Sequence, residues 1–414
     1  MRIAVIGTGI SGLVASYLLA DDHDLTVFEA NDYIGGHTHT VKVDDPSGPT
    51  NVDTGFIVYN EWTYPNFCKL LDRLGVETQA SNMSFSVRDD AADIEYKGDN
   101  LNTLFAQRSN FLRWGHYRML YEILRFYRQS RRLLNRSADG LTMGNYLRQE
   151  RYSTEFIERH LIPMGAAIWS ADPNQFYDFP AAYFVRFCHN HGMLNILRRP
   201  QWRVIRGGSL QYVRKITAPF HSRIRLSTPV KTIKRQPDSV EVTSERFGTE
   251  RFDQVIIAAH SDQALRMLAD PTPSETEVLG KMRYQRNDVA LHHDTSCLPH
   301  RRKAWSSWNY HIPKTRQSTA IVTYNMNELQ SLGTDRTYCV TLNASEHIDE
   351  KKCLRQLRYD HPVYTTDSVL AQKRHSEISG VHRTHYCGAY WGYGFHEDGV
   401  NSGLTVCKQF GKGL

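Results

Sequence analysis

The beginning of the chain alternates between apolar runs and glycine-rich turns, and this pattern predicts a strand, a helix and a second strand in succession. Ile3 to Ile6 is a continuous apolar run, which is typical of a strand buried on both faces. Leu13 to Ala20 supplies the helix that follows the turn, and Leu25 to Phe28 supplies the second strand. The first residues are therefore predicted to form an α/β unit.

The pattern further along predicts more elements of both kinds. Pro65 to Leu74 is predicted to be a helix, because Phe67, Leu70 and Leu71 share one face and Gly75 ends it. Further helices are predicted at 152–160, from 210 onward and at 263–268. Apolar or alternating runs predict strands at 37–43, 223–233, 239–243, 252–259, 287–293, 318–325 and 337–342. The strands at 223–233 and 239–243 are expected to form a hairpin or meander, and the last three a sheet in a second domain.

Two aromatic-rich segments allow two interpretations each. The segment 111–134 combines arginines with aromatic and aliphatic residues at helical spacing. It is either a helix that packs on the core with an arginine-covered face in solvent, or an interfacial helix that contacts lipid headgroups or an acidic tail. The segment 176–187 is dense in aromatic residues, which suit either the wall of an apolar pocket or a buried helix.

The turn after the first strand carries the chemistry of the amino-terminal unit. Gly7, Gly9 and Gly12 form a G-x-G-x-x-G motif between strand and helix. In a dinucleotide site the first glycine permits the tight turn, the second lets the backbone approach a diphosphate, and the third allows close helix packing. Glu29 ends the second strand, where a carboxylate accepts hydrogen bonds from a ribose and disfavours NADP. A glycine-rich turn in an ordinary α/β unit is the alternative, but it leaves the position of Glu29 unexplained.

Length, charge and cysteine content narrow the class of protein. A chain of 414 residues predicts two or three structural units. The net charge of +6 and the pI of 8.8 fit attraction to anionic ligands or a membrane surface. Seven scattered cysteines without a C-x-x-C pair favour a reducing cytoplasm and argue against disulfides or zinc. No apolar run reaches the length of a membrane span, and we expect no signal peptide, no metal and no nucleic-acid partner.

The motifs, taken in order, resemble the flavin-dependent amine oxidoreductase superfamily, which includes monoamine oxidases, protoporphyrinogen oxidase and carotenoid desaturases. The resemblance rests on the glycine motif with Glu29, the double glycine 35–36, the element 207–210, the run 255–260 and the terminal stretch 394–403. It implies that the dinucleotide is FAD. It also implies an α/β fold with a Rossmann-like FAD-binding domain (1–78, 200–275 and 380–414). A discontinuous mixed α+β substrate domain (79–199 and 276–379) would include the helical segment 100–199.

Three stretches resemble a narrower, bacterial branch that is often encoded beside cyclopropane fatty acid synthase. They are Asp53 to Asn60, Ala167 to Ser170 and Cys387 to Gly399. The flavin-containing fatty acid isomerases and desaturases are similar in layout. The resemblance therefore implies a lipid or fatty acyl substrate, and a lipid-modifying enzyme as a candidate partner. Together with segment 111–134, it leads us to expect a cytoplasmic protein with peripheral contact at the inner membrane face.

The resemblance also assigns residues to the cofactor. Those expected to hold FAD are Gly7, Gly9, Ser11, Gly12, Glu29, Gly36, His37, Gly55, Phe56, Val230, Phe395, Gly399 and Ser402. Three departures from the family are visible. His37 stands where the family has an arginine, Glu397-Asp398-Gly399 replaces Glu-Gly-Ala, and the strand 287–293 lacks the lysine of amine oxidases. These departures disfavour a primary amine as substrate.

The leading hypothesis is an FAD-dependent oxidoreductase that transfers a hydride from an acyl chain to flavin N5. One alternative is a fatty acid double-bond isomerase, and another is a non-catalytic flavoprotein partner of a lipid-modifying enzyme. Tyr59, Asn60 and Trp391 are the candidates for residues near the flavin face. Structural packing or loop capping is the alternative role for each of these three residues.

Overall fold

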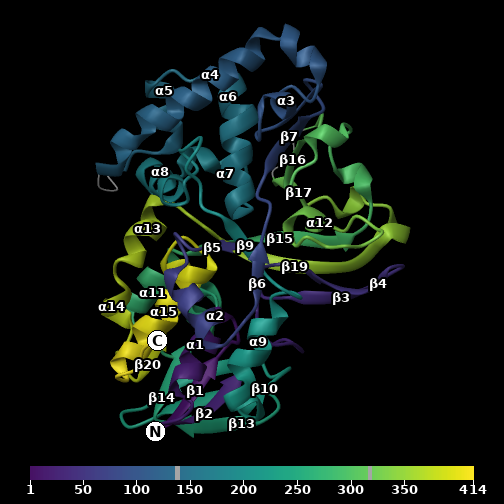
Figure 1. Cartoon of the computed structure of the whole chain (residues 1–414). Helices are drawn as coiled ribbons and strands as arrows, with labels where there is room; N and C mark the ends of the chain where they lie inside the picture. Colours follow the sequence, from purple (N-terminus) through teal and green to yellow (C-terminus); the bar gives the residue numbers. More distant parts are fainter. Residues whose placement is uncertain (136–139, 316–318) are drawn as a thin grey trace.

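The computed structural model describes residues 1–135, 140–315 and 319–414, and a parallel sheet surrounds its N-terminus (Figure 1). The five strands of this sheet follow the order β10-β2-β1-β14-β20. They are β1 (Arg2–Ile6), β2 (Asp24–Phe28), β10 (Ile224–Arg225), β14 (Gln254–Ile257) and β20 (Thr384–Tyr386). The sheet draws strands from all three segments that the sequence assigns to the FAD-binding domain.

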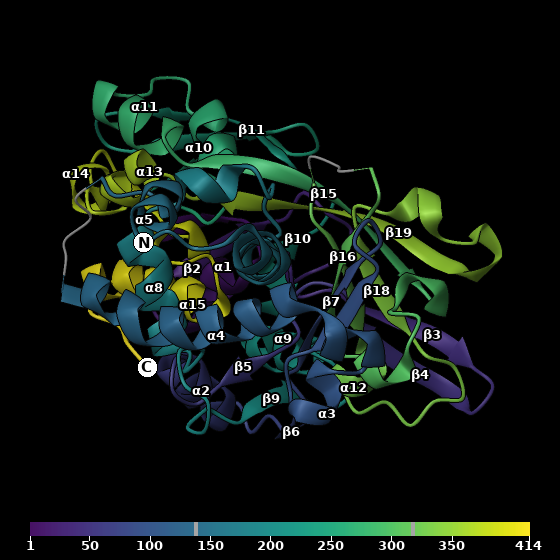
Figure 2. The ribbon, with the colours of Figure 1, turned by 90° about the horizontal axis from the view of Figure 1, so that it is seen from above.

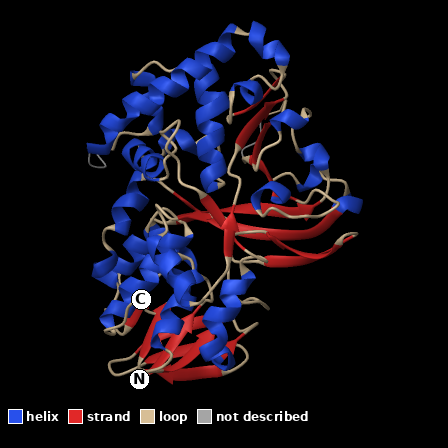
Figure 3. Ribbon diagram, viewed as in Figure 1, coloured by secondary structure: helices blue, strands red, loops and turns tan. Residues whose placement is uncertain are grey.

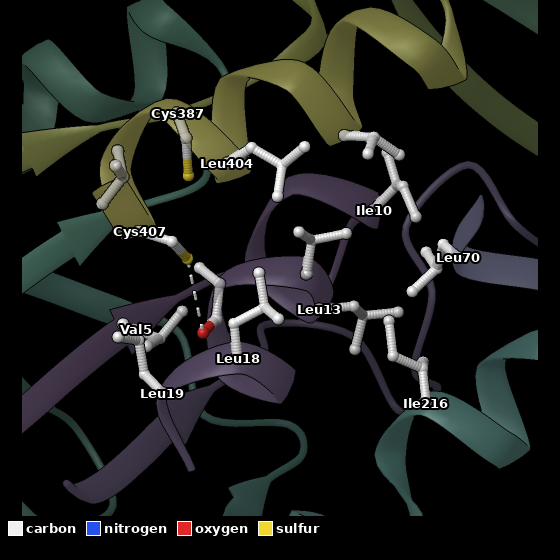
Figure 4. Packing of buried hydrophobic residues seen from close by; sticks show 14 of the residues in the cluster. Val5, Ile10, Leu13, Leu18, Leu19, Leu70, Ile216, Cys387, Leu404 and Cys407 are labelled. Atoms are coloured by element: carbon white, nitrogen blue, oxygen red, sulfur yellow. Dashed lines mark hydrogen bonds between the residues drawn. The ribbon is translucent and has the colours of Figure 1, made fainter. Parts of the chain in front are cut away.

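The central strand β1 is buried because each of its faces lies against a separate apolar layer. Ile3 and Val5 join the layer that contains helix α1 (Ile10–Leu19), whereas Ala4 and Ile6 point to the opposite layer. Figure 4 shows the first layer, in which α1 packs against α15 (His396–Gln409), α9 (Leu210–Thr217) and α2 (Pro65–Arg73). This packing explains the continuous apolar run that identifies β1 in the sequence.

The fold is mixed α/β as the sequence predicts, but the predicted strand 223–233 is two strands. Its first part is β10 in the parallel sheet, and its second part is β11 (Val230–Arg235). Ser227 has φ of +47° and Pro229 follows it, so the chain turns between the two strands. β11 pairs with β12 (Val240–Ser244) and β13 (Gly248–Phe252) in an antiparallel sheet, which is the meander expected there.

A seven-stranded sheet forms the second layer of strands (Figure 3). Its order is β19-β15-β18-β17-β16-β7-β8. The strands are β7 (Phe85–Asp89), β8 (Ile94–Lys97), β15 (Arg283–His292), β16 (Trp308–Ile312), β17 (Ile321–Asn325), β18 (Cys339–Leu342) and β19 (Cys353–Val363). The three strands predicted for a second domain all lie in this sheet, although residue 318 of the middle one lies outside the described residues.

Helices cover one end of this sheet, and α4 (Trp114–Gln129) lies across them at the surface (Figures 1 and 2). The segment predicted as one helix, 111–134, contains the end of η1 (Arg108–Leu112), α4 and most of η2 (Ser130–Asn135). The other helices here are α3 (Leu101–Leu104), α5 (Met143–Gln149), α6 (Thr154–Phe156), α7 (Ile162–Trp169) and α8 (Ala181–Asn190).

A π-helical turn, η3 (Ile157–Leu161), joins α6 to α7, and a proline explains it. Pro163 has no N–H group to donate to the carbonyl of Arg159, four residues earlier. The hydroxyl of Tyr96 donates to that carbonyl oxygen at 2.7 Å instead. A side chain from β8 thereby satisfies the backbone group that the proline leaves unpaired.

The remaining elements are short. The strands are β3 (Thr40–Asp45), β4 (Gly48–Asp53), β5 (Tyr59–Asn60), β6 (Thr78–Ala80) and β9 (Trp202–Ile205). The α-helices are α10 (Ser261–Met267), α11 (Pro273–Gly280), α12 (Met326–Leu329), α13 (Thr366–Gln372) and α14 (His375–Ile378). The 3₁₀ turns are η4 (Gln175–Asp178), η5 (Ala218–Arg223), η6 (Thr295–Cys297), η7 (Arg302–Ala304), η8 (Ser345–His347), η9 (Glu350–Lys352) and η10 (Ala389–Trp391). Within the described ranges, no helix has the length and apolar character needed to cross a bilayer.

Candidate functional site

The three glycines of the turn after β1 have three different surroundings. A Cβ atom on Gly7 would lie 2.8 Å from the carbonyl oxygen of Ala258, and φ at Gly7 is +105°. A Cβ on Gly12 would lie 2.1 Å from the carbonyl oxygen of Gly7. A Cβ on Gly9 would meet no atom within 4 Å. The loop is therefore closely packed at its first and third glycines and open at the second, where a diphosphate would approach.

The double glycine closes over this loop from the other side. Gly36 has φ of +59°, and a Cβ on it would lie 3.1 Å from Cα of Gly9. The N–H of Gly35 donates to the hydroxyl of Thr8 at 3.2 Å. Gly36 therefore lies beside the open glycine, and its role in holding the cofactor stays a prediction.

Glu29 is buried at the end of β2, and its carboxylate faces the glycine loop. Its Oε2 atom accepts from the N–H and the hydroxyl of Thr8. Its Oε1 atom accepts from the N–H and the side-chain amide of Asn31, at 2.8 and 3.0 Å. Two backbone donors fix the carboxylate, and the two side-chain donors are groups that ribose hydroxyls can replace.

The N-terminal turns of α1 and α15 meet beside the same loop. A Cβ on Gly399 would lie 2.5 Å from Cγ2 of Ile10 and 3.2 Å from Oγ of Ser11. The hydroxyl of Ser402 accepts the N–H of Gly388 at 3.0 Å. Gly399 and Ser402 thus hold α15 in place, and the free N–H groups of two helix ends favour negative charge here.

The two acids that follow His396 cap helices. The carboxylate of Glu397 accepts the N–H groups of Asn66 and Phe67 at the start of α2, at 3.0 and 2.8 Å. Asp398 accepts the N–H of Phe395, the residue before α15, at 3.0 Å. Burial raises the pKa of Asp398 to about 7. The departure from Glu-Gly-Ala therefore adds a carboxyl group at the start of α15.

Three histidines from distant parts of the sequence gather next to Gly36. The ring centroid of His37 lies 6.0 Å from that of His260, which follows β14, and 5.5 Å from that of His361 in β19. Burial lowers the pKa of His37 and His260 to about 4 and that of His361 to about 3, so all three are neutral at pH 7. The side-chain amide of Asn287 in β15 donates to Nδ1 of His361 at 2.9 Å. The buried Nε2 atom of His37 has no hydrogen-bond partner.

Phe56 and His396 form a stacked pair at the start of α15. Their ring centroids lie 3.4 Å apart, and Nε2 of His396 lies 3.0 Å from the hydroxyls of both Thr38 and Tyr212. Gly55 packs on the backbone of His37, since a Cβ on Gly55 would lie 2.1 Å from the His37 carbonyl oxygen. The structure therefore brings the predicted residues Gly55, Phe56, Gly36 and His37 together.

Phe395 joins this region to a cluster of aromatic side chains. Its ring stacks on Phe187 at 5.0 Å and lies 6.3 Å from Trp169. We define the aromatic cluster by its seven members, which are Trp169, Phe179, Tyr183, Phe187, Tyr364, Tyr393 and Phe395. The segment 176–187 thus supplies three of its members, as a pocket wall or a buried helix would.

Two cavities adjoin the aromatic cluster. A small one of about 10 Å³ is lined by Trp169, Phe179 and Tyr364 among others. A surface pocket of about 360 Å³ lies beside it, and both cavities include Val363 in their walls. The hydroxyl of Tyr364 is buried without a partner. The inner cavity is barely large enough for one water molecule.

The remaining predicted residues lie apart from one another. Tyr59 packs on Phe67, while Asn60 accepts the N–H groups of residues 62 and 63 and closes the turn before α2. Trp391 packs edge-on against His375 at 4.6 Å, in a different part of the core. Val230 begins β11. It lies two residues after Thr228, whose N–H donates to the carbonyl oxygen of Glu29. Catalytic roles for Tyr59, Asn60 and Trp391 stay predictions.

Sequence reasoning did not select His260, His361, Asn287 or the tyrosines of the aromatic cluster. For His260 a signal exists, because it follows β14, the parallel neighbour of β1, and such strand ends form binding sites. His361 lies inside a long strand, and nothing near it in the sequence indicates that it faces His37. Across the described residues, no three His, Cys, Asp or Glu side chains are arranged to hold a metal ion.

The residues present fit FAD. The open space at Gly9 suits a diphosphate, the Glu29 carboxylate suits a ribose, and the unpartnered Nε2 of His37 is a buried polar atom that a ligand can satisfy. Gly9 follows β1, Glu29 follows β2, and Gly36, the residue before His37, lies against Gly9, so the diphosphate position lies between the ribose position and His37, as a dinucleotide requires.

Comparisons with known proteins agree with this arrangement. The profile of a family described as flavin containing amine oxidoreductase matches residues 10–291. The AofH protein of Mycobacterium tuberculosis, whose name assigns it to the flavin-containing monoamine oxidases, is 25% identical over 290 residues. The match covers 67% of this chain and 61% of that protein, so the chain spans less than two thirds of this relative's length.

Solved structures of two oxidases and a fatty acid isomerase have the same fold. Cyclohexylamine oxidase from Brevibacterium oxydans has a TM-score of 0.68 at 17% identity, over 99% of both chains. Wild-type putrescine oxidase bound to putrescine has a TM-score of 0.70 at 15% identity, again over 99% of both chains. A CLA-producing fatty acid isomerase from P. acnes has a TM-score of 0.69 at 15% identity, over 99% of this chain and 98% of that one. At these identities the likeness shows the fold alone.

Proposed function

The chain belongs to the flavin-containing amine oxidoreductase family with FAD as its cofactor, and we propose that it oxidises a fatty acyl chain. The chemistry that bound FAD supplies is acceptance of a hydride at N5. The observation that carries the acyl substrate is the aromatic cluster, which begins at Phe395 beside the start of α15 and presents seven aromatic rings. Such a surface suits a hydrocarbon chain, which needs burial rather than hydrogen bonds.

The strand β15 gives a second argument against a primary amine. Its sequence, Arg283–His292, contains no lysine, and its buried polar residue next to the histidines is Asn287. Asn287 donates to His361 and accepts from the side-chain amide of Asn343 at 2.8 Å, so its hydrogen bonds are internal. Asp398 is an acidic group near the aromatic cluster, but it accepts the N–H of Phe395. We infer that the site orients an uncharged chain.

The protein would act by holding and orienting both partners. Gly9 and Gly36 leave room for the diphosphate, and Glu29 would hold the ribose. The neutral histidines 37, 260 and 361 would add no positive charge beside the double glycine. The aromatic cluster would exclude water from the acyl chain.

Anaerobic mixing tests the proposal. FAD-loaded protein is mixed with unsaturated, methyl-branched and cyclopropane fatty acids, both free and in phospholipids, and with putrescine and benzylamine as the matched amine panel. We expect loss of the visible flavin absorbance with at least one acyl substrate and none with the amines. Reduction by an amine alone would overturn the acyl proposal while leaving the flavoenzyme intact.

The same experiment separates the two alternatives. A fatty acid isomerase, the activity named for the structural neighbour from P. acnes, would shift a double bond without lasting flavin reduction or oxygen consumption. A non-catalytic partner of a lipid-modifying enzyme would bind FAD and leave every substrate unchanged. Product analysis by mass spectrometry, with oxygen uptake recorded in parallel, distinguishes oxidation from both. An enzyme that modifies acyl chains, such as a cyclopropane synthase, remains the proposed partner.

A further inference from the structure

The outward face of α4 is apolar, whereas the core-packing interpretation of segment 111–134 requires an arginine-covered face. Trp114, Tyr117, Tyr121 and Leu124 recur every three or four residues and are 81%, 41%, 67% and 52% exposed. We call these four residues the outer face of α4. The opposite face is buried and carries His116, Met119, Glu122 and Phe126.

Exposed apolar side chains concentrate on this part of the chain. Of the seventeen large apolar residues that are exposed in the described ranges, seven lie between positions 101 and 124. The 3₁₀ turn η1, directly before α4, adds Phe111 and Leu112, which are 49% and 91% exposed. A concentration of exposed apolar side chains on one segment marks a contact with a partner or a membrane, whereas scattered exposed residues need no explanation.

The charges around the outer face are almost all positive. Between positions 101 and 135 the sequence has seven arginines and a single acid, Glu122. Glu122 is buried, accepts the N–H of Ser153 and lies 3.8 Å from Arg118. Arg118 is half-exposed at the side of the outer face. Arg128 lies one helical turn after Leu124, the last residue of the outer face. It makes no ion pair or hydrogen bond with the described residues.

The other five arginines between positions 101 and 135 have structural partners. Arg108 donates to the carbonyl of residue 105 at 3.0 Å, and Arg113 donates to the carbonyl of residue 92 at 2.7 Å. Arg125 donates to the carbonyl of Glu150 at 2.5 Å and packs on Tyr152 at 4.5 Å. Arg131 donates to the carbonyl of residue 194 at 3.0 Å, and Arg132 lies 3.5 Å from the carboxylate of Glu150. Any attraction of this segment to a negatively charged surface must therefore depend on Arg118 and Arg128, together with the apolar outer face of α4.

We propose that η1 and the outer face of α4 dock this protein on an anionic phospholipid bilayer. Tryptophan and tyrosine beside aliphatic residues match the boundary between headgroups and acyl chains. The arginines complement the negative surface of such a bilayer. A second copy of the chain fits less well. A two-fold contact through this face would bring arginines against arginines, with only a buried glutamate to oppose them.

Sedimentation with vesicles tests the proposal on the FAD-loaded protein. The vesicles are phosphatidylglycerol mixed with phosphatidylcholine, and phosphatidylcholine alone. The apolar variant combines Trp114→Gln, Tyr121→Gln and Leu124→Gln. Its matched control combines Phe247→Gln, Leu354→Gln and Leu370→Gln, which are also exposed by about 42–44% but lie outside the segment.

The charge variant combines Arg118→Gln with Arg128→Gln, and its control combines Lys42→Gln with Lys303→Gln, two exposed lysines elsewhere. We expect wild-type protein to bind the anionic vesicles at low salt and to leave them at high salt, where the Debye length falls to about 3 Å at 1 M. The apolar variant should lose at least tenfold in binding. The charge variant should lose roughly fivefold per arginine and much of the salt dependence. Both controls should bind as wild type.

Three results would overturn the proposal. One is wild-type protein that stays in solution with anionic vesicles at low salt. Another is unchanged binding of the apolar variant, because the outer face would then not be the contact. The third is a dimer in analytical ultracentrifugation that Trp114→Gln alone dissociates, which would assign this face to a second copy. Melting temperatures of all variants check that each is folded. We expect all of them to fold, since every substituted side chain is exposed or half-exposed.

Discussion

A Cβ atom on Gly403 would lie 2.8 Å from the carbonyl oxygen of Ser11, so α15 packs directly on the backbone of α1. Gly399, one helical turn earlier, makes the same kind of approach to Ile10. These two glycines bring the start of the last helix of the chain to the glycine loop at its beginning. The cofactor site therefore depends on a contact between the two ends of the sequence.

Alanine at Gly403 should destabilise the protein by about 1–3 kcal/mol, because its methyl group would push α15 away from α1. The matched substitution is Gly280→Ala at the end of α11, where a Cβ meets only Leu265 at 3.9 Å. It should be neutral or stabilising by up to about 1 kcal/mol, since alanine favours a helix. Urea unfolding of both variants measures the difference, and equal effects would mean that the helix contact is loose.

Replacing Glu29 by alanine should weaken FAD binding by about 1.5–3 kcal/mol, which is the scale of charge-assisted hydrogen bonds. Glu29→Gln keeps an acceptor oxygen and should lose less. Asn31→Ala is the control, because Asn31 only orients one oxygen of the carboxylate. Affinity is read from flavin fluorescence in a titration. An affinity for FAD that is unaffected by Glu29→Ala would place the ribose elsewhere.

His37 should contribute to FAD binding more than to the stability of the free protein. His37→Phe keeps a ring at this position but removes the unpartnered Nε2 atom, and we expect a loss of about 0.5–1.5 kcal/mol in FAD affinity. His39→Phe is the comparison, since Nδ1 of His39 already lies 3.1 Å from the Tyr359 hydroxyl. That variant should mainly lower the melting temperature. A loss of FAD affinity in His39→Phe, with only a lower melting temperature in His37→Phe, would contradict the site described above.

The stability of the protein should depend on pH through His292. This side chain is fully buried in β15, its Nδ1 accepts the N–H of Asp294 at 3.0 Å, and burial lowers its pKa from 6.5 to about 4. The unfolded chain therefore binds more protons than the folded chain between these values, so this contribution is present above pH 6.5 and is lost as the pH falls towards 4. The difference in unfolding free energy between wild type and His292→Gln should shrink between pH 7 and pH 5. A constant difference would show that His292 does not titrate on unfolding.

Much of the fold follows from local patterns. Apolar runs predict β1, β2 and β14, and the face shared by Phe67, Leu70 and Leu71 predicts α2, because these elements satisfy their hydrogen bonds with regular backbone. The glycine motif predicts the loop, because the tight turn and the close helix packing need glycine at its first and third positions. Each of these signals lies within a few residues of the feature that it predicts.

Features that depend on tertiary contacts could not be predicted in this way. His37 and His361 meet because β19 packs on the residues that follow the double glycine, where Tyr359 contacts the His37 ring; the two histidines are more than 300 positions apart in the sequence. For segment 111–134 the sequence left open whether its apolar side chains pack on the core or contact lipid headgroups, since the sequence cannot tell which of two apolar faces is covered. The strand 223–233 divides at Pro229 because its halves join different sheets.

The central claim is that FAD lies across the glycine loop, and the substitution Gly9→Val tests it most directly. A side chain at Gly9 meets no atom of the protein within 4 Å, and its backbone, with φ of −63°, suits any residue. The variant should therefore fold and melt like the wild type. Gly12→Val is the contrasting variant, because a Cβ there would lie 2.1 Å from the Gly7 carbonyl oxygen and should prevent folding.

The measurement is the FAD content and affinity of purified wild type and Gly9→Val, after reconstitution with excess FAD. We predict one FAD per chain in the wild type, released on denaturation, and a folded but colourless Gly9→Val protein. Wild-type protein that takes up no FAD, or a folded Gly9→Val protein with wild-type affinity, would contradict the account.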